Sequence, residues 1–129
     1  MNDFSNALSL AASGLKAQSA RLLHTSENIA NADTPGYRRK TVPFETTVGG
    51  DMPGQVKTGR VRLDQSDLKQ IYDPSHPLAD ETGLYSGSNV NLVIEIADAR
   101  EAQRSYEANL KMFDQTRQMS SSLMDLLRR

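Results

Sequence analysis

The sequence predicts a mainly α-helical protein with a small β insert, in which long N- and C-terminal helices pair as a coiled-coil-like hairpin. Two observations support this fold class. Apolar residues recur at heptad spacing near both ends of the chain, and the middle holds short alternating runs punctuated by Pro and Gly. We therefore expect residues 1–36 and 89–129 to form a terminal helical domain and residues 37–88 to form a β-rich insert.

Residues 3–32 are expected to form the first helix, whose apolar stripe repeats every seven positions after Phe4 as Leu8, Leu15, Leu22 and Ile29. Residues 1–32 carry only four charged side chains and are otherwise rich in Ala, Ser, Gly and Asn. An exposed helix normally has a charged outer face. We interpret the small residues as a surface that another backbone can approach closely, although weak selection for solubility would give the same composition.

The first helix should end at a sharp turn. Pro35 disfavours helix in the residue before it, and Gly36 suits the positive-φ position of a type II turn. Asn28 and Asn31 are poor mid-helix residues, so we expect their amides to bond to this turn or to a neighbour, the alternative being that they merely fray the helix end. Tyr37 is expected to anchor the turn on the helices.

The insert should hold short strands with little core of their own, as a β-hairpin or a three-stranded sheet. The predicted strands are Tyr37–Val48 with an edge or bulge at Pro43, Gln55–Leu63 broken at Gly59, and Ile71–Tyr72. Two segments are expected to be turns or irregular loops, Gly49–Gly54 and Asp73–Gly83.

Residues 91–127 are predicted to form the second helix, with Asn91 as its N-cap. Its apolar stripe follows three- and four-residue spacing through Ile96, Ala99, Tyr106, Leu110, Phe113, Met124 and Leu127. We expect this stripe to pack against that of the first helix, either within one subunit or between subunits.

The length of the helices favours assembly. A helix of about 35 residues is roughly 50 Å long, whereas a compact globule of this chain length is only about 36 Å across. Such helices could pair as a monomeric hairpin that carries a β insert. The alternative is a subunit whose terminal helices bundle with those of other molecules.

Composition and motifs predict no enzyme and no cofactor. The chain has no cysteine, and its net charge is −1, which gives no basic field for nucleic acid. Arg38-Arg39-Lys40 is interpreted as part of a solvated strand or loop. Of the two histidines, His24 is expected at a surface or interface, and His76 is expected to pack in its loop rather than bind metal. We find no secretory signal, no membrane-spanning run, no small-molecule site and no catalytic motif.

The segment that ends the first helix resembles the hallmark of the bacterial flagellar axial proteins, which form the rod, the hook and the hook–filament junction. That hallmark is close to Asn-Leu-Ala-Asn-Ala-Asn-Thr-Pro-Gly-Tyr, and this chain has Asn28, Ile29, Ala30, Asn31, Ala32, Asp33, Thr34, Pro35, Gly36 and Tyr37. The chain looks most like the proximal-rod members of the family over essentially its whole length. The stretches that carry this resemblance are Ala12–Ser19, Tyr37–Phe44, Tyr72–Asp80, Asn89–Val93 and Ala102–Asn109.

The resemblance implies a structural role. A rod subunit would leave the cell unfolded through the flagellar type III export apparatus, without a cleaved signal, and assemble in the periplasm with copies of itself and other rod subunits. Its terminal helices would line a tube that transmits motor torque to hook and filament, and its β insert would lie outside.

Other readings of the sequence remain open at this point. A sibling rod protein would share the hallmark and the length. A secreted coiled-coil interaction module would explain the heptads but not the ten-residue hallmark. A small hydrolase or metal-binding domain built on the His76 loop lacks a converging set of acid, base and ligand residues.

Overall fold

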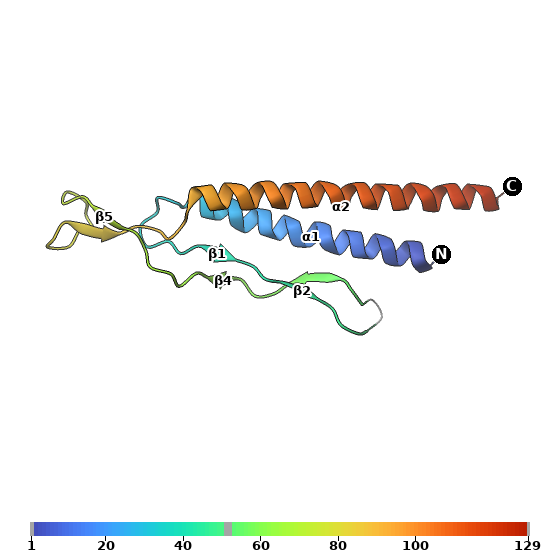
Figure 1. Ribbon diagram of the computed structural model, residues 1–129, viewed down its shortest axis with the longest axis horizontal. Coiled ribbons are helices and arrows are strands. Elements are labelled where there is room, and N and C mark those ends of the chain that lie inside the picture. Colours follow the sequence, from blue (N-terminus) through green and yellow to red (C-terminus); the bar gives the residue numbers. More distant parts are fainter. Residues whose placement is uncertain (1, 51–52, 129) are drawn as a thin grey trace.

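The computed structural model describes residues 2–50 and 53–128. Two long helices lie side by side, so that both chain ends are at the same end of the molecule (Figure 1). A thin β arm follows the flank of the first helix, and a separate hairpin lies at the opposite end from the termini (Figure 1). The predicted mainly α-helical hairpin with a small β insert is therefore confirmed.

Helix α1 spans Asn2–Ala30, so it ends two residues before the predicted end at residue 32. The backbone N–H of Tyr37 donates to the Thr34 carbonyl at 3.2 Å, and Gly36 has a φ of 76°. A proline at the second position and a positive-φ glycine at the third define a type II turn, so this prediction is confirmed. The turn sends the chain back along α1 as the first half of the arm.

Helix α2 spans Leu92–Leu127 and begins at a regular cap. Asn91 is extended, and its side-chain oxygen accepts the backbone N–H of Val93 at 3.1 Å, as predicted for an N-cap. With 36 residues, α2 is about 54 Å long, whereas the 29 residues of α1 give about 44 Å. The C-terminal end of α2 consequently projects beyond the start of α1 (Figure 1).

The insert consists of three antiparallel two-stranded pairs. The strands are β1 (Lys40–Thr41), β2 (Phe44–Thr46), β3 (Val56–Thr58), β4 (Arg62–Leu63), β5 (Gln70–Tyr72) and β6 (Leu84–Ser86). The pairs β1–β4 and β2–β3 follow one another along a single arm, with Thr41 opposite Arg62 and Phe44 opposite Thr58. The pair β5–β6 forms the separate hairpin. Among the described residues no three-stranded sheet forms, so that alternative was wrong.

Both predicted long strands are interrupted where Pro43 and Gly59 meet. Gly59 donates its backbone N–H to the Pro43 carbonyl at 2.8 Å, and a Cβ at position 59 would lie 2.9 Å from Pro43 Cγ. The two sides of the arm are therefore in direct contact at this point.

Strand β6 was not predicted, and it follows a loop that was expected to be irregular. The predicted turn Gly49–Gly54 includes residues 51 and 52, which lie outside the described residues.

The core of the described chain is thin. The buried apolar side chains are small apart from one valine: Ala11, Ala17, Val90 and Ala102. As many polar or charged residues are buried beside them: Thr25, Asn28, Ser88 and Glu95. The accessible surface is 9047 Å², against about 6,800 Å² for a compact protein of this mass. The fold thus leaves an unusual amount of surface uncovered.

Candidate assembly site: the polar junction and the open end

The end of α1, the base of the arm and the start of α2 meet at a set of hydrogen-bonded side chains, here called the polar junction. Its members are Asn28, Tyr37, Arg39, Lys40, Ser88 and Glu95. Asn28, Ser88 and Glu95 are each only 1% exposed. Three of the most deeply buried side chains are therefore polar, and each of these groups needs a partner.

Asn28 satisfies both ends of its amide within the junction. Its Nδ2 donates to the Lys40 carbonyl at 2.9 Å and to Glu95 Oε2 at 3.2 Å. Its Oδ1 accepts the backbone N–H of Lys40 at 2.9 Å and the Tyr37 hydroxyl at 2.8 Å. One side chain of α1 thereby joins the turn, strand β1 and α2, which confirms the predicted anchoring of Asn28 and Tyr37.

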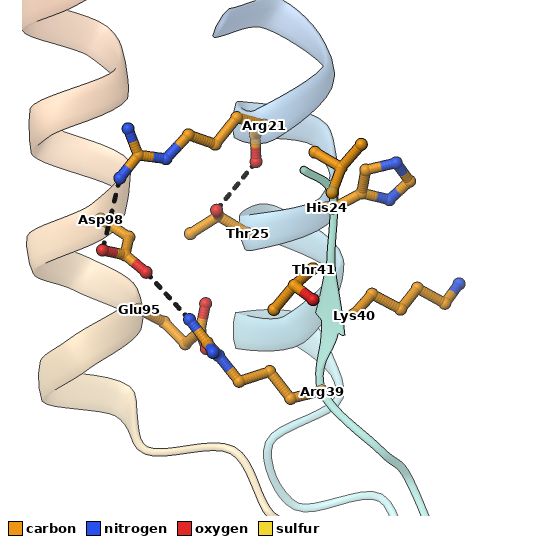
Figure 2. Close-up of a pocket in the computed structure, with 9 residues that line it drawn as sticks. Arg21, His24, Thr25, Arg39, Lys40, Thr41, Glu95 and Asp98 are labelled. Atoms are coloured by element: carbon orange, nitrogen blue, oxygen red, sulfur yellow. Dashed lines mark hydrogen bonds and ion pairs between the residues drawn. The ribbon is translucent and has the colours of Figure 1, made fainter. Parts of the chain in front are cut away.

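Glu95 is a buried carboxylate with a cationic partner. Its Oε1 accepts a hydrogen bond from Arg39 Nε, and the Arg39 Nη2 donates to Asp98 Oδ2 at 2.9 Å. Arg21, on α1, approaches the other oxygen of Asp98 at 3.4 Å, so that two arginines from different elements hold one aspartate of α2 (Figure 2). A buried carboxylate is stable only with such pairing.

The charges of the junction shift the titration of neighbouring groups. Burial lowers the pKa of the Arg39 guanidinium, but the hydrogen bond and negative charge of Glu95, with that of Asp98, outweigh burial and raise it overall. Burial raises the pKa of the Tyr37 hydroxyl. Arg39 therefore stays charged and Tyr37 stays neutral near neutral pH.

Residues 87–89, just before α2, form hydrogen bonds to the end of α1 and to the turn that follows it. Ser88 donates its hydroxyl to the Ala32 carbonyl, and Gly36 donates its backbone N–H to the Gly87 carbonyl at 3.1 Å. Asn89 Oδ1 accepts the backbone N–H of Arg39 at 2.7 Å. The hallmark turn is consequently held by the segment that leads into the second helix.

The remaining hallmark residues shape the helix end. Asn31 Nδ2 donates to the Glu27 carbonyl at 2.9 Å, and Asn31 Oδ1 accepts the Thr34 hydroxyl at 3.1 Å, which confirms its predicted role. Ile29 and Ala32 are half-buried. The other members, Ala30, Asp33, Thr34, Pro35 and Gly36, are exposed.

The opposite end of the helix pair is here called the open end, and it comprises residues 3–10 of α1 and 112–127 of α2. No side chain in either range is buried. Large apolar residues of α2 face solvent there: Met112, Met119, Leu123, Met124, Leu126 and Leu127. With Phe4, several of them line an open groove of about 560 Å³. Such a continuous apolar surface is typical of an interaction site.

The structure leaves the predicted packing stripes only partly covered. Eight of these residues are half-buried: Phe4, Leu8, Leu15, Leu22, Ile29, Ala99, Tyr106 and Phe113. Four are exposed: Ile96, Leu110, Met124 and Leu127. The helices also approach one another at a glycine, since a Cβ at Gly14 would lie 3.0 Å from the Asn109 amide. A side chain of α2 fills this place, so the interpretation that another backbone approaches α1 closely stays a prediction.

His24 lies half-buried on α1, with its Nδ1 3.8 Å from Glu27 Oε2, and His76 packs in its loop as predicted. His76 stacks on Tyr85 with ring centroids 3.9 Å apart, and its Nδ1 accepts the backbone N–H of Leu78 at 3.1 Å. Within residues 2–50 and 53–128, no three metal-ligating side chains cluster. Neither helix, over its described length, carries an apolar stretch long enough to cross a bilayer.

Comparison with known proteins agrees with this arrangement. A family model for flagella basal body rod proteins matches residues 2–38, and a model for the C-terminal region of flagellar basal body rod FlgEFG proteins matches residues 81–126. The chain is 47% identical to the flagellar basal-body rod protein FlgC of Agrobacterium fabrum, over 99% of this chain and 98% of that one. The chain belongs to the FlgC family of flagellar basal-body rod proteins.

More distant FlgC proteins match over nearly the same length. Identity is 35% to FlgC of Salmonella typhimurium, covering 94% of this chain and 96% of the relative. It is 37% to FlgC of Aquifex aeolicus, covering 92% and 93%. As a member of the FlgC family, the chain is a structural subunit of the flagellar basal-body rod.

The ionic half of the junction was not predicted from the sequence. The segment Arg38-Arg39-Lys40 does run into strand β1, but Arg39 is not a solvated side chain, because it is only 23% exposed and pairs with Glu95. Lys40 is 36% exposed, and its Nζ lies 2.8 Å from Glu27 Oε2. Glu95 offered a usable signal, since it is the only charge within the apolar run Leu92–Ile96. In this FlgC-family chain, a lone carboxylate in such a run marked a buried ion pair.

Proposed function

We propose that the protein assembles through its terminal helices, with copies of itself and with other rod subunits, into a helical tube that transmits motor torque to hook and filament. In this tube the helices form the inner layer and the β arm lies outside. The observation that carries the proposal is the open end, where large apolar residues of a long helix stay exposed in the isolated subunit.

The amount of uncovered surface supports a permanently assembled state. The chain exposes about 2,300 Å² more than a compact protein of its mass, which exceeds the area buried in a standard protein–protein interface. Torque loads the contacts between subunits in shear. Long interdigitated helices spread that load over many contacts and need no chemistry, so we propose that the protein is not an enzyme.

The route to the rod is also part of the proposal. We infer export through the flagellar type III apparatus, without a cleaved signal, and assembly in the periplasm. A thin core suits this route, because a subunit with few buried apolar side chains is easily kept unfolded before it reaches its neighbours.

The test replaces an exposed apolar residue of the open end. Leu126 is 64% exposed, so Leu126→Asp should change the stability of the isolated chain by less than about 0.5 kcal/mol. In a strain that lacks the native gene product, it should nevertheless abolish swimming and rod formation while the protein is still exported. Leu126→Met, which keeps an apolar side chain of similar volume at the same position, is the matched control and should swim. Basal bodies of normal appearance from Leu126→Asp cells, seen by electron microscopy, would refute the proposal.

A further inference from the structure

We propose that the ion-pair cluster of Arg39, Glu95 and Asp98, with the amide of Asn28, fixes the register in which α1 and α2 pair. These are positioning residues. They determine which residues of α2 project past the start of α1 and so which apolar side chains the open end offers to neighbours. The proposal rests on the proposed function only for this last consequence.

The apolar seam does not specify the register by itself. Leu8, Leu15 and Leu22 recur every seven residues, so a slip of one heptad would place another leucine at the same site. Buried positions on the two helices, such as Ala11 and Ala102, are small and project little. Small, repeating side chains thus tolerate several alignments of the two helices.

The connection between the helices does not specify it either. A short loop would hold two antiparallel helices in one alignment, but here residues 31–91 lie between α1 and α2. The arm contacts α1 along its length, for example where Val56 donates its backbone N–H to the Ser13 hydroxyl oxygen at 3.1 Å. The arm is therefore tied to α1, and residues 87–89 tie the segment before α2 to the turn, but the body of α2 needs a tie of its own.

The ion-pair cluster supplies that second tie. Arg39 comes from the arm, and it contacts both Glu95 and Asp98, which lie one turn apart on α2 (Figure 2). Asn28 of α1 donates to the same Glu95. Glu95 is 1% exposed, so a slip would leave its charge buried without a partner, which is strongly unfavourable. The cluster is matched at one alignment only.

The absence of cysteine from the chain permits a direct test. A Cβ at position 14 would lie 3.1 Å from Asn109 Cγ, the place that a cysteine sulfur would take. Gly14→Cys is combined with Asn109→Cys to report the observed register, and with Ser105→Cys or Thr116→Cys to report slips of one turn or one heptad. Oxidation of the purified full-length chain should favour the 14–109 disulfide by at least about tenfold. Equal yields from the three pairs would overturn the proposal.

The second arm of the experiment separates register from stability. In the double variant Arg39→Met with Glu95→Met, apolar side chains replace the ion pair, and such exchanges often leave stability unchanged or higher. We expect helicity by circular dichroism to persist while the preference for the 14–109 disulfide falls below about threefold. A preference that survives unchanged in the folded variant would show that the apolar seam sets the register.

A single substitution keeps the test decisive if the double variant does not fold. Glu95→Gln and Glu101→Gln each neutralise one carboxylate of α2, but the Glu101 side chain is 69% exposed, against 1% for Glu95. Glu95→Gln should increase the slipped disulfides, and Glu101→Gln should not. Equal effects of the two, or none from Glu95→Gln, would contradict the proposal. These readouts need no assembled rod, so their failure is distinct from failure of the rod function.

Discussion

The two ends of the helix pair are stabilised in opposite ways. At the polar junction, buried side chains such as Asn28 and Glu95 have specific partners on other elements. At the open end, no side chain of residues 3–10 or 112–127 is buried, and Leu127 is 70% exposed. One end is thus completed within the subunit, whereas the other holds apolar surface that only further molecules can cover.

The difference indicates that the polar junction serves the folding of the subunit and that the open end serves its assembly. Polar contacts are directional, so the junction sets the geometry of the chain. Apolar contacts are not directional and scale with area, so the open end can supply association free energy to neighbours of related shape. A subunit with a self-sufficient apolar core would have less surface left for the tube.

The largest effect on the subunit itself should come from breaking the junction. Arg39→Ala leaves Glu95 buried without its cationic partner, and the loss of free energy of unfolding should be about 3–5 kcal/mol. Urea denaturation followed by circular dichroism measures this loss. Arg60→Ala, at an exposed arginine of the arm, is the matched control and should change stability by less than about 0.5 kcal/mol. If both substitutions cost the same, the junction is not the stable end.

A smaller effect is expected at the turn. Gly36 has a φ of 76° and no atom within 4 Å of where its Cβ would be, so the strain of a substitution comes from the backbone alone. Gly36→Val should cost about 2 kcal/mol and impair swimming. Gly36→Asn should cost clearly less, because asparagine tolerates this conformation. Normal swimming of the valine variant would argue that the turn does not limit assembly.

The smallest effect is the dependence of stability on pH. The Lys40 hydrogen bond lowers the pKa of Glu27 below its ordinary 4.5, with burial opposing. A carboxylate whose pKa is lower in the folded state contributes stability above its unfolded pKa and loses it as pH falls through the folded value. Stability should therefore decline below about pH 4.5, and Glu27→Gln should flatten that decline. An unchanged slope in the variant would exclude the Glu27–Lys40 pair as a cause.

Much of the helical architecture could be predicted because its signals are local. The heptads, the Asn91 cap and the turn at Pro35–Gly36 each depend on residues close together in sequence. The strands were less predictable. The two-residue pair β1–β4 and the late strand β6 depend on partners far along the chain, with Lys40 opposite Leu63 and Gln70 opposite Ser86.

In the candidate site, too, the local features were predicted and the long-range partners were not. The hallmark residues identified the place where α1 ends, and Asn28 and Tyr37 took the expected roles. The partners Arg39 and Glu95 were not predicted, because an ion pair across 56 positions leaves no periodic trace in the sequence. Heptad periodicity identified apolar stripes but gave no indication of how much of each stripe the subunit itself would cover.

Hydrogen exchange of backbone amides, compared between the purified chain and the assembled rod, tests the contrast between the two ends most directly. In the isolated chain, slow exchange should be confined to the region around the junction, residues 17–41 and 88–102, while the open-end residues 3–10 and 112–127 exchange rapidly. In the rod, both regions should exchange slowly. Uniform protection along both helices of the isolated chain would contradict the account, since the open end would then need no neighbours.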